Sequence, residues 1–290
     1  MFEHEYPRVL SIAGSDSGGG AGIQADLKTF SALGCYGMTA ITALTAQNTR
    51  GVRGIHGVPP AFLKAQLQAV IEDIGVHAVK IGMLHAPEIV DVVAWAIDEY
   101  RLPNVVLDPV MVATSGDRLI AQETVQGLVR ELFPRAVVVT PNLDEAALLL
   151  GRELPGVEAL APAAADLLAL GARAVLLKGG HLPGEEVVDV LAQAGDGGAA
   201  PAFERLHARR IASANIHGTG CTLSSAIACG LAVGLDLSQA VAQARRYVLQ
   251  ALASGAGVRT GQGHGPLNHG HAPLPARLLP LAALSPRADA

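Results

Sequence analysis

The sequence contains few charged residues and no excess of basic ones. Of its 290 residues only 16% are charged, and the formal net charge at pH 7 is −5. A surface that binds nucleic acid needs clustered Lys and Arg to neutralise the phosphates. We therefore expect no nucleic acid among the partners of this protein.

Signals for export and for membrane insertion are also lacking. The first residues include Glu3, Glu5 and Pro7, where a signal peptide would have a basic segment and then an unbroken apolar run. The most apolar later stretch, residues 160–177, is interrupted by a proline, a glycine and two charged residues. It is too broken to span a bilayer as a lipid-facing helix, so we expect a cytoplasmic protein without a membrane partner.

The three cysteines, Cys35, Cys221 and Cys229, are odd in number and form no CxxC motif. This pattern favours reduced thiols over disulfides or a zinc site. Cys229 is expected to lie in the core as a small apolar residue, whereas Cys221 belongs to a glycine-rich motif.

Two common nucleotide-binding motifs are absent. The sequence has no Gly-Lys dipeptide, which excludes the P-loop and its phosphate-binding lysine. A glycine-rich segment at residues 14–26 follows an apolar run, but Ile23 stands where the dinucleotide-binding fingerprint requires its third glycine. Five glycines fall within residues 14–22, more than a tight turn needs. We therefore expect the backbone to approach a ligand closely there.

Half of the residues are hydrophobic, which is enough for one large core. Short apolar runs alternate with segments of helical periodicity, and this alternation predicts βαβ units and a mostly parallel sheet. The predicted strands are residues 9–13, 78–81, 105–107, 137–139 and 174–177, and the predicted helices are residues 23–33, 61–74, 88–100, 123–132, 145–150 and 159–170. Residues 187–191 and 203–211 are predicted to pair antiparallel across a loose turn.

We expect a single domain over residues 1–270 and a flexible tail over residues 271–290. The segment from residue 260 is rich in Gly, Pro and His and then turns to Ala, Leu and Pro, so its last fifteen or so residues are expected to be poorly ordered. His264, His269 and His271 are expected to be solvated, because no carboxylate or cysteine accompanies them at metal-ligand spacing.

The motif Gly218-Thr219-Gly220-Cys221 immediately precedes a segment with an apolar helical face. Backbone N–H groups at such a helix start converge on an anion, and glycines let the backbone close around phosphate oxygens. The same field is expected to lower the pKa of the Cys221 thiol. Otherwise Cys221 would be a small buried thiol.

Asp108, Glu145 and Lys178 lie where predicted strands end, and ligands of parallel sheets bind at those ends. Two carboxylates beside ATP phosphates are enough to hold Mg²⁺, and the Lys178 ammonium could reach a polyphosphate. The alternatives are a helix N-cap for Asp108, a first-turn helix acid for Glu145 and a solvated lysine. Taken singly, either carboxylate favours its structural alternative.

Seven motifs together resemble the hydroxymethylpyrimidine and phosphomethylpyrimidine kinases of the ribokinase superfamily. The resemblance covers roughly the first 270 residues, and the motifs occur in one order. They are GSDSGGGAGIQADLKT (residues 14–29), TALTAQNT (42–49), KIGML (80–84), LDPVM (107–111), TPNLDEA (140–146), LLKGGH (176–181) and HGTGCTLSSAI (217–227).

This resemblance implies a three-layer α/β/α sandwich with a central, mostly parallel sheet, assembled as a homodimer. It implies a kinase of thiamin biosynthesis that uses ATP and Mg²⁺ on a small pyrimidine. The implied substrate-binding residues are Gly14, Asp26, Gln47, Met83 and Val110; the implied ATP-binding residues are Asn142, Glu145, Lys178 and Thr219, with Asp108 and Glu145 on the metal.

The resemblance also places catalysis at the residues 218–221 motif and at Lys178. Gly218, Thr219 and Gly220 would form the anion hole, and Cys221 would act as general base where many superfamily relatives carry Asp. A pyridoxal kinase is the nearest alternative, since its substrate also carries a hydroxymethyl group on an aromatic N-heterocycle. A non-catalytic nucleotide- or vitamin-binding regulator is a remote alternative, because a pure binder needs no metal and transfer groups.

Overall fold

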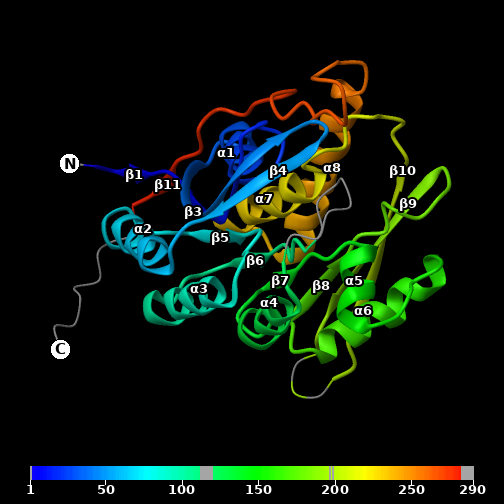
Figure 1. The fold of residues 1–290 in the computed structure, drawn as a ribbon, viewed down its shortest axis with the longest axis horizontal. Coiled ribbons are helices and arrows are strands. Elements are labelled where there is room, and N and C mark those ends of the chain that lie inside the picture. Colours follow the sequence, from blue (N-terminus) through cyan, green and yellow to red (C-terminus); the bar gives the residue numbers. More distant parts are fainter. Residues whose placement is uncertain (1, 112–119, 196, 198, 282–290) are drawn as a thin grey trace.

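The computed structural model describes residues 2–111, 120–195, 197 and 199–281. A nine-stranded sheet runs through them in the order β10-β9-β8-β7-β6-β5-β2-β3-β4 (Figure 1). The strands from β3 to β8 in this order are parallel, while β4, β9 and β10 are antiparallel to their neighbours. The predicted mostly parallel sheet and the antiparallel β9–β10 pair are confirmed.

The helices and strands alternate along most of the chain. The strands are β1 (His4–Glu5), β2 (Arg8–Asp16), β3 (Tyr36–Asn48), β4 (Gly51–Gly57), β5 (Ala78–Ile81), β6 (Val105–Leu107), β7 (Val138–Val139), β8 (Ala174–Leu177), β9 (Glu186–Gln193), β10 (Ala202–Arg209) and β11 (Leu279–Pro280). The helices are α1 (Gly22–Ala32), α2 (Pro60–Asp73), α3 (Pro87–Tyr100), α4 (Gln122–Gly127), α5 (Leu143–Leu150), α6 (Leu160–Ala169), α7 (Thr219–Ala232) and α8 (Leu237–Gly255); a π-helix, η1 (Leu128–Leu132), continues α4, and a short 3-10 helix, η2 (Val157–Ala159), precedes α6.

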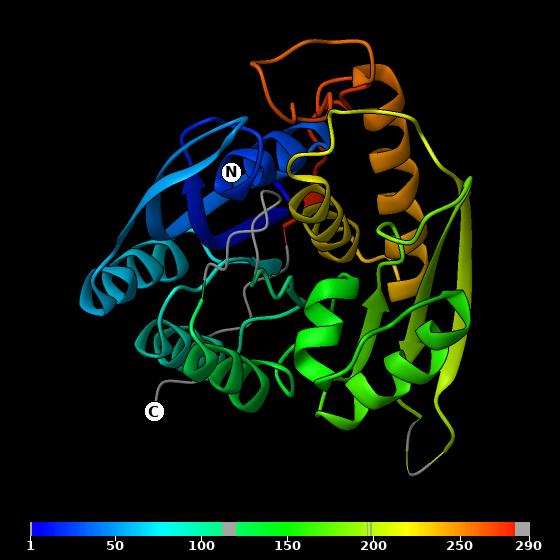
Figure 2. The same cartoon turned by 45° about the vertical axis from the view of Figure 1, so that its right-hand side comes forward.

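Two helical layers cover the sheet, one on each face. In β6, Val106 packs with α1, α7 and α8, whereas Val105 and Leu107 pack with the layer that contains α2, α3, α5 and α6. Successive strand residues point to opposite faces, so a continuous apolar run fits a sheet that is covered on both sides. Figures 1 and 2 show the two layers, and the predicted α/β/α sandwich is confirmed.

Three elements next to the site were not predicted. Strands β3 and β4 are rich in Gly, Ala and Thr, and β4 is largely exposed at the edge of the sheet. Neither has the unbroken apolar run of a central strand, so the pattern that revealed β5 or β8 was missing. Helix α8 was also missed, although Asp236 and Gln239 form a capping box at its start.

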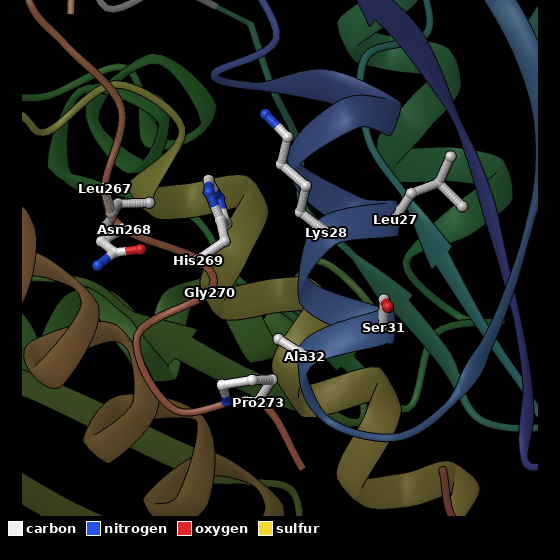
Figure 3. A pocket seen from close by; sticks show the side chains of 9 residues that line it. All are labelled: Leu27, Lys28, Ser31, Ala32, Leu267, Asn268, His269, Gly270 and Pro273. Atoms are coloured by element: carbon white, nitrogen blue, oxygen red, sulfur yellow. The ribbon is translucent and has the colours of Figure 1, made fainter. Parts of the chain in front are cut away.

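The segment after α8 is anchored to the protein at several points as far as residue 281, while most of its residues are exposed. His217 N–H donates to Gly265 O (3.1 Å), Leu274 N–H donates to Ala32 O (2.8 Å), and β11 pairs with β1. Figure 3 shows this segment running beside α1, where Lys28 and His269 line a shallow hollow. Residues 282–290 lie outside the described residues, and the domain boundary at residue 270 stays a prediction.

His269 is buried at 5% exposure, contrary to the expected solvated histidine. Its Nε2 lies 3.0 Å from Thr222 Oγ1 of α7, and Tyr247 Oη donates to its carbonyl oxygen (2.6 Å). Burial, with a smaller contribution from Lys28, lowers the pKa of His269 to about 4. The tertiary fold therefore closes over a residue whose local sequence is typical of a loop.

The buried His269 predicts a loss of stability in acid. A histidine whose pKa is lowered on folding takes up its proton first in the unfolded chain, so stability is lost as pH falls below about 6.5 and the loss levels off near pH 4. We expect this to cost about 3 kcal/mol of unfolding free energy. In His269→Gln, the free energy of unfolding measured with urea should differ less between pH 7 and pH 4.5 than it does in the wild type. The matched variant His264→Gln, at an exposed position, should keep the wild-type difference.

Among the described residues, no helix has both the length and the apolar character required to cross a bilayer.

Candidate active site

A cavity of about 710 Å³ lies at the carboxyl ends of the parallel strands. Residues that end or follow β2, β6, β7 and β8 line it, together with the start of α7. These include nearly all of the predicted site residues: Gly14, Gln47, Met83, Asp108, Val110, Asn142, Glu145, Lys178, Gly218, Thr219, Gly220 and Cys221. Asp26 alone of the predicted residues is absent from the lining.

The first turn of α7 is held against the glycine-rich loop that follows β2. Gly218 adopts φ +82°, and a Cβ there would come within 1.9 Å of Gly20 O. Thr219 Oγ1 donates to Ile216 O (2.6 Å), so this side chain braces the turn. The helix itself offers no acceptor to the N–H groups of Gly220 and Cys221. With the dipole, they form an anion-binding helix start at the cavity wall.

Replacing Gly218 with alanine should therefore displace this helix start. A Cβ would meet a backbone oxygen and would also occupy the left-handed region that disfavours side chains. We expect kcat/KM to fall about ten- to a hundredfold in a steady-state assay. Gly234→Ala is the matched control, because Gly234 has φ +85° with nothing within 4 Å of the added Cβ. Equal losses in the two variants would contradict a specific role for close packing at Gly218.

Lys178 and the two carboxylates form one electrostatic unit. Lys178 Nζ donates to Asp108 Oδ1 (3.0 Å), which also accepts from Thr140 Oγ1 (3.0 Å). Burial opposes ionisation of Asp108, but Lys178 and Lys80 outweigh it and lower the pKa of that carboxyl. A Cβ on Gly220 would lie 3.2 Å from Lys178 Nζ, so the first turn of α7 abuts this pair.

Glu145 has both a structural role and a place in the cavity. Its carboxylate accepts from the Asn142 N–H (2.8 Å), and its own N–H donates to Asn142 Oδ1 (2.9 Å), forming a capping box at α5. The predicted first-turn helix acid is therefore present. Burial, opposed by Lys178, raises the pKa of Glu145 to about 7. By contrast, Asp108 follows β6 and caps no helix among the described residues.

The expected lowering of the Cys221 pKa is wrong. Burial raises the pKa of the thiol to about 11; Lys80 opposes this rise, whereas the negative charges of Asp26 and Asp108 add to it. The Gly22 N–H donates to the sulfur and also lowers the pKa, but by less than burial raises it. On the order of one thiol in ten thousand is ionised at pH 7 with such a pKa.

Asp26 lies beneath the cavity and is bonded by three side chains. Its carboxylate accepts from Lys80 Nζ (2.8 and 2.9 Å), Ser11 Oγ (2.6 Å) and Ser225 Oγ (2.7 Å), and both Asp26 and Lys80 are fully buried. Because no face of Asp26 is open, it is placed to hold Lys80 rather than a substrate. This corrects its expected place in the lining. Lys80 does line the cavity, and a lysine inside the apolar run AVKI was the signal for it.

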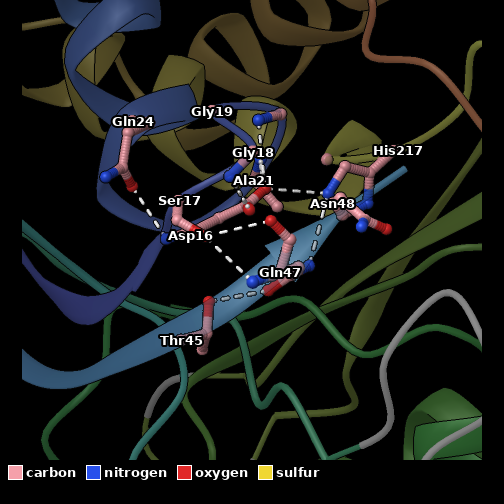
Figure 4. A network of polar contacts seen from close by, with 12 residues as sticks. Asp16, Ser17, Gly18, Gly19, Ala21, Gln24, Thr45, Gln47, Asn48 and His217 are labelled. Carbon is pink, nitrogen blue, oxygen red and sulfur yellow. Dashed lines mark hydrogen bonds and ion pairs between the residues drawn. The ribbon is translucent and has the colours of Figure 1, made fainter. Parts of the chain in front are cut away.

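A polar network joins the loop after β2 to the residue before the helix start (Figure 4). Asp16 is 3% exposed and accepts from the N–H groups of Gly18, Gly20 and Ala21 (2.8–3.0 Å). His217 Nε2 lies 2.9 Å from Asp16 Oδ2. Burial opposes ionisation of Asp16, but these donors lower the pKa of its carboxyl. Sequence reasoning singled out neither residue, although both stand inside the two glycine-rich motifs.

Part of the cavity lining comes from a segment that no motif identified. Arg210 lines it, and its guanidinium donates to Gly184 O (2.7 Å), Gly180 O (2.8 Å) and Leu182 O. One arginine thus holds the loop that follows Lys178 at three carbonyls. Asp189 accepts from Gly179 N–H (2.8 Å) and Arg245 Nε (2.9 Å) at the base of the same loop.

A helix start with free N–H groups abuts a half-buried lysine and two carboxylates in one cavity, at the carboxyl ends of a parallel sheet. Phosphoryl transfer requires this combination of positioning and charge neutralisation. The fold and the site define a ribokinase-like small-molecule phosphotransferase.

Comparison with known proteins identifies the family. The pattern of the family described as phosphomethylpyrimidine kinase matches residues 16–268, and the chain belongs to that family. It is 52% identical over 264 residues to the hydroxymethylpyrimidine/phosphomethylpyrimidine kinase of Rhizobium meliloti, covering 91% of this chain and 97% of that one.

Two solved structures extend the comparison. The phosphomethylpyrimidine kinase of Clostridium difficile has a TM-score of 0.73 and 42% identity, covering 84% of this chain and 99% of that one. A Bacillus subtilis pyridoxal kinase in complex with ADP has a TM-score of 0.82 and 39% identity, covering 91% and 98%. The fold is therefore shared by kinases of two vitamin substrates.

Proposed function

We propose that this protein uses ATP to phosphorylate 4-amino-5-hydroxymethyl-2-methylpyrimidine and then its monophosphate, giving the pyrophosphate used in thiamin assembly. The main structural observation behind this proposal is the cavity in which the α7 start, Lys178 and two carboxylates meet. The family membership supports the pyrimidine as substrate. A cytoplasmic location agrees with such a biosynthetic role.

ATP and Mg²⁺ are the proposed cofactors. A Staphylococcus aureus pyridoxal kinase with the same fold has been solved with AMP-PCP and pyridoxal (TM-score 0.82, 33% identity), which supports ATP as donor. Among the described residues, no three His, Cys, Asp or Glu side chains form a metal cluster. Asp108 and Glu145 still fit Mg²⁺, since two carboxylates beside phosphates are enough; when bound, the ion would neutralise charge on the phosphates.

The protein's own groups would act chiefly by positioning and charge. Asn142, Glu145 and Thr219 would bind the nucleotide side, and the Lys178 ammonium would face the transferring phosphoryl group. Of the predicted anion hole, the Thr219 N–H already donates to Ile216 O (3.2 Å), so the N–H groups of Gly220 and Cys221 would receive its oxygens. Gly14, Gln47, Met83 and Val110 would surround the pyrimidine. Gly14 packs directly against Met83, because a Cβ there would meet Met83 Cε at 2.7 Å.

Cys221 is proposed to contribute to the transfer step, and its replacement measures how. Because its pKa is about 11, the neutral thiol predominates at pH 7–8 and a thiolate base would be rare. We expect Cys221→Ala to lower kcat about tenfold with little change in KM, since a catalytic base is among the more dispensable parts of phosphoryl transfer. Unchanged kcat would remove Cys221 from the chemistry. Cys229→Ala, at a core position, is the control.

The test is turnover by the purified protein with ATP and Mg²⁺, measured separately on hydroxymethylpyrimidine, its monophosphate and pyridoxal. Product from both pyrimidines supports the two-step kinase. Turnover on pyridoxal alone would assign the protein to vitamin B6 salvage, a candidate favoured by the pyridoxal kinases among its structural neighbours. If no ADP forms with any acceptor, the non-catalytic nucleotide- or vitamin-binding regulator is the candidate that remains.

We also propose that the protein is a homodimer. Strand β4 is an edge of the sheet, and the apolar side chains of Leu44 and Ile55 are about half exposed on the β3–β4 extension. An exposed edge strand with apolar neighbours favours association. Light scattering of the wild type and of Ile55→Lys should give dimer and monomer masses, respectively.

A further inference from the structure

The backbone of Gln47 is fixed at a strand irregularity beside the cavity. The β3–β4 register shifts between Ala46 and Gln47, and such bulges re-aim a side chain. Ser17 Oγ donates to Gln47 O and accepts from Gln47 N–H, both at 2.9 Å. The position of the side chain is therefore set by the protein before any ligand binds.

Thr45 determines which end of the amide can lie beside it. As drawn in Figure 4, Gln47 Oε1 is 3.0 Å from Thr45 Oγ1. Thr45 Oγ1 is also 2.8 Å from Ser15 O, and a carbonyl oxygen can only accept. A hydroxyl has one hydrogen, so Thr45 donates to Ser15 and must accept from Gln47. An amide nitrogen, not an oxygen, satisfies that contact.

His217 makes the same demand at the other end. Its Nε2 lies 2.9 Å from Asp16 Oδ2 and 3.4 Å from Gln47 Nε2. An ionised carboxylate only accepts, so His217 Nε2 carries a proton whatever the state of the other ring nitrogen. An amide N–H facing that N–H would place two donors together, whereas an amide oxygen could share the single Nε2 hydrogen with Asp16 Oδ2 as a longer, second acceptor. The two ends of a glutamine amide are assigned from such partners.

We propose that Thr45 and His217 hold the Gln47 amide rotated by 180°, with Nε2 at Thr45 and Oε1 at His217, and that this orientation selects an aminopyrimidine over its oxo isostere. Each amide end keeps one further site: an N–H donor on the Thr45 side and an oxygen acceptor on the His217 side. A 4-aminopyrimidine offers the complement, with the amino group toward His217 and the ring nitrogen toward Thr45.

The substrate cannot rotate by 180° to compensate for the opposite orientation of the Gln47 amide. Its hydroxymethyl group must face the α7 start, and His217 immediately precedes that motif, so the neighbouring amino group falls on the His217 side. A 4-oxo pyrimidine presents a carbonyl acceptor there and a ring N–H donor on the Thr45 side. That pattern would leave unpaired polar groups, the contrast that a hydrogen-bonding site discriminates best. Thr45 and His217 are thus positioning residues for specificity.

The kinetic test rests on the proposed function and compares Thr45→Val with Thr45→Ser. The measured quantity is the ratio of kcat/KM for hydroxymethylpyrimidine to that for its 4-oxo analogue. Valine removes the acceptor and frees the amide to turn, so the ratio should fall about tenfold or more; serine keeps the hydroxyl and should keep the ratio within about threefold. A purely structural effect lowers both rates together. An unchanged ratio in Thr45→Val, whatever the individual rates, overturns the proposal.

A second measurement does not depend on the substrate. Neutron diffraction of deuterium-exchanged, ligand-free protein crystals should show deuterium on the amide terminus next to Thr45. Deuterium on the terminus next to His217 overturns the proposed orientation. If the wild type phosphorylates no pyrimidine while the neutron map shows nitrogen at Thr45, then the proposed function fails and the amide orientation stands.

Discussion

Replacing Lys178 with methionine should lower kcat about a hundred- to a thousandfold. Its ammonium lies 3.0 Å from Asp108 Oδ1 and beside the first turn of α7, where charge would develop on the transferring phosphoryl group in the proposed reaction. Removing one preorganised positive donor at such a point has an effect of this size. Steady-state kinetics with saturating ATP should show the loss mainly in kcat.

Lys28→Met is the matched control for Lys178→Met. Lys28 donates to Gly19 O (2.7 Å) and lies outside the large cavity, so its loss should leave kcat within about twofold. Thermal unfolding of both variants separates a catalytic from a structural loss. A Lys178→Met protein that keeps near wild-type kcat would contradict the proposed site map.

Replacing Lys80 with methionine should destabilise the fold by about 3–5 kcal/mol. Lys80 and Asp26 are fully buried at 2.8 Å, and removing one partner leaves an uncompensated buried charge. The pKa of Lys80 is raised: burial opposes its charge, but the nearby carboxylates of Asp26 and Asp108 help to outweigh that effect. The lysine therefore remains charged throughout the working pH range. Urea unfolding at pH 7 measures the change.

Two further variants test the origin of that instability. Lys80→Met combined with Asp26→Asn should recover part of the loss, because the amide carries no buried charge: its oxygen can accept from one of the two serine hydroxyls, and its NH2 can donate to the other. Arg130→Met removes the exposed Arg130–Glu131 pair and should change stability by less than about 1 kcal/mol. No recovery in the double variant would show that packing, not charge, is responsible.

Local patterns were enough to predict most of the central sheet. Runs such as residues 105–107 and 174–177 are apolar at every position, since strands covered on both faces have no solvent side. Strands β3 and β4 were not predicted, because Gly, Ala and Thr replace such an apolar run where one side of the strand is exposed. His269 escaped for the opposite reason: nothing in a Gly- and Pro-rich segment shows that α7 and α8 will cover it.

By itself, the sequence determined most of the central parallel strands and their helices, the family, and a set of site residues of which nearly all line the cavity, because ordered motifs and periodicity are local properties. Tertiary structure alone decided the state of those residues. It placed Asp26 beneath the cavity with Lys80, and it raised the pKa of Cys221 by burial. It also brought Asp16 to His217, 201 residues away. Burial and charge pairing depend on which distant segments meet, and no local pattern records that.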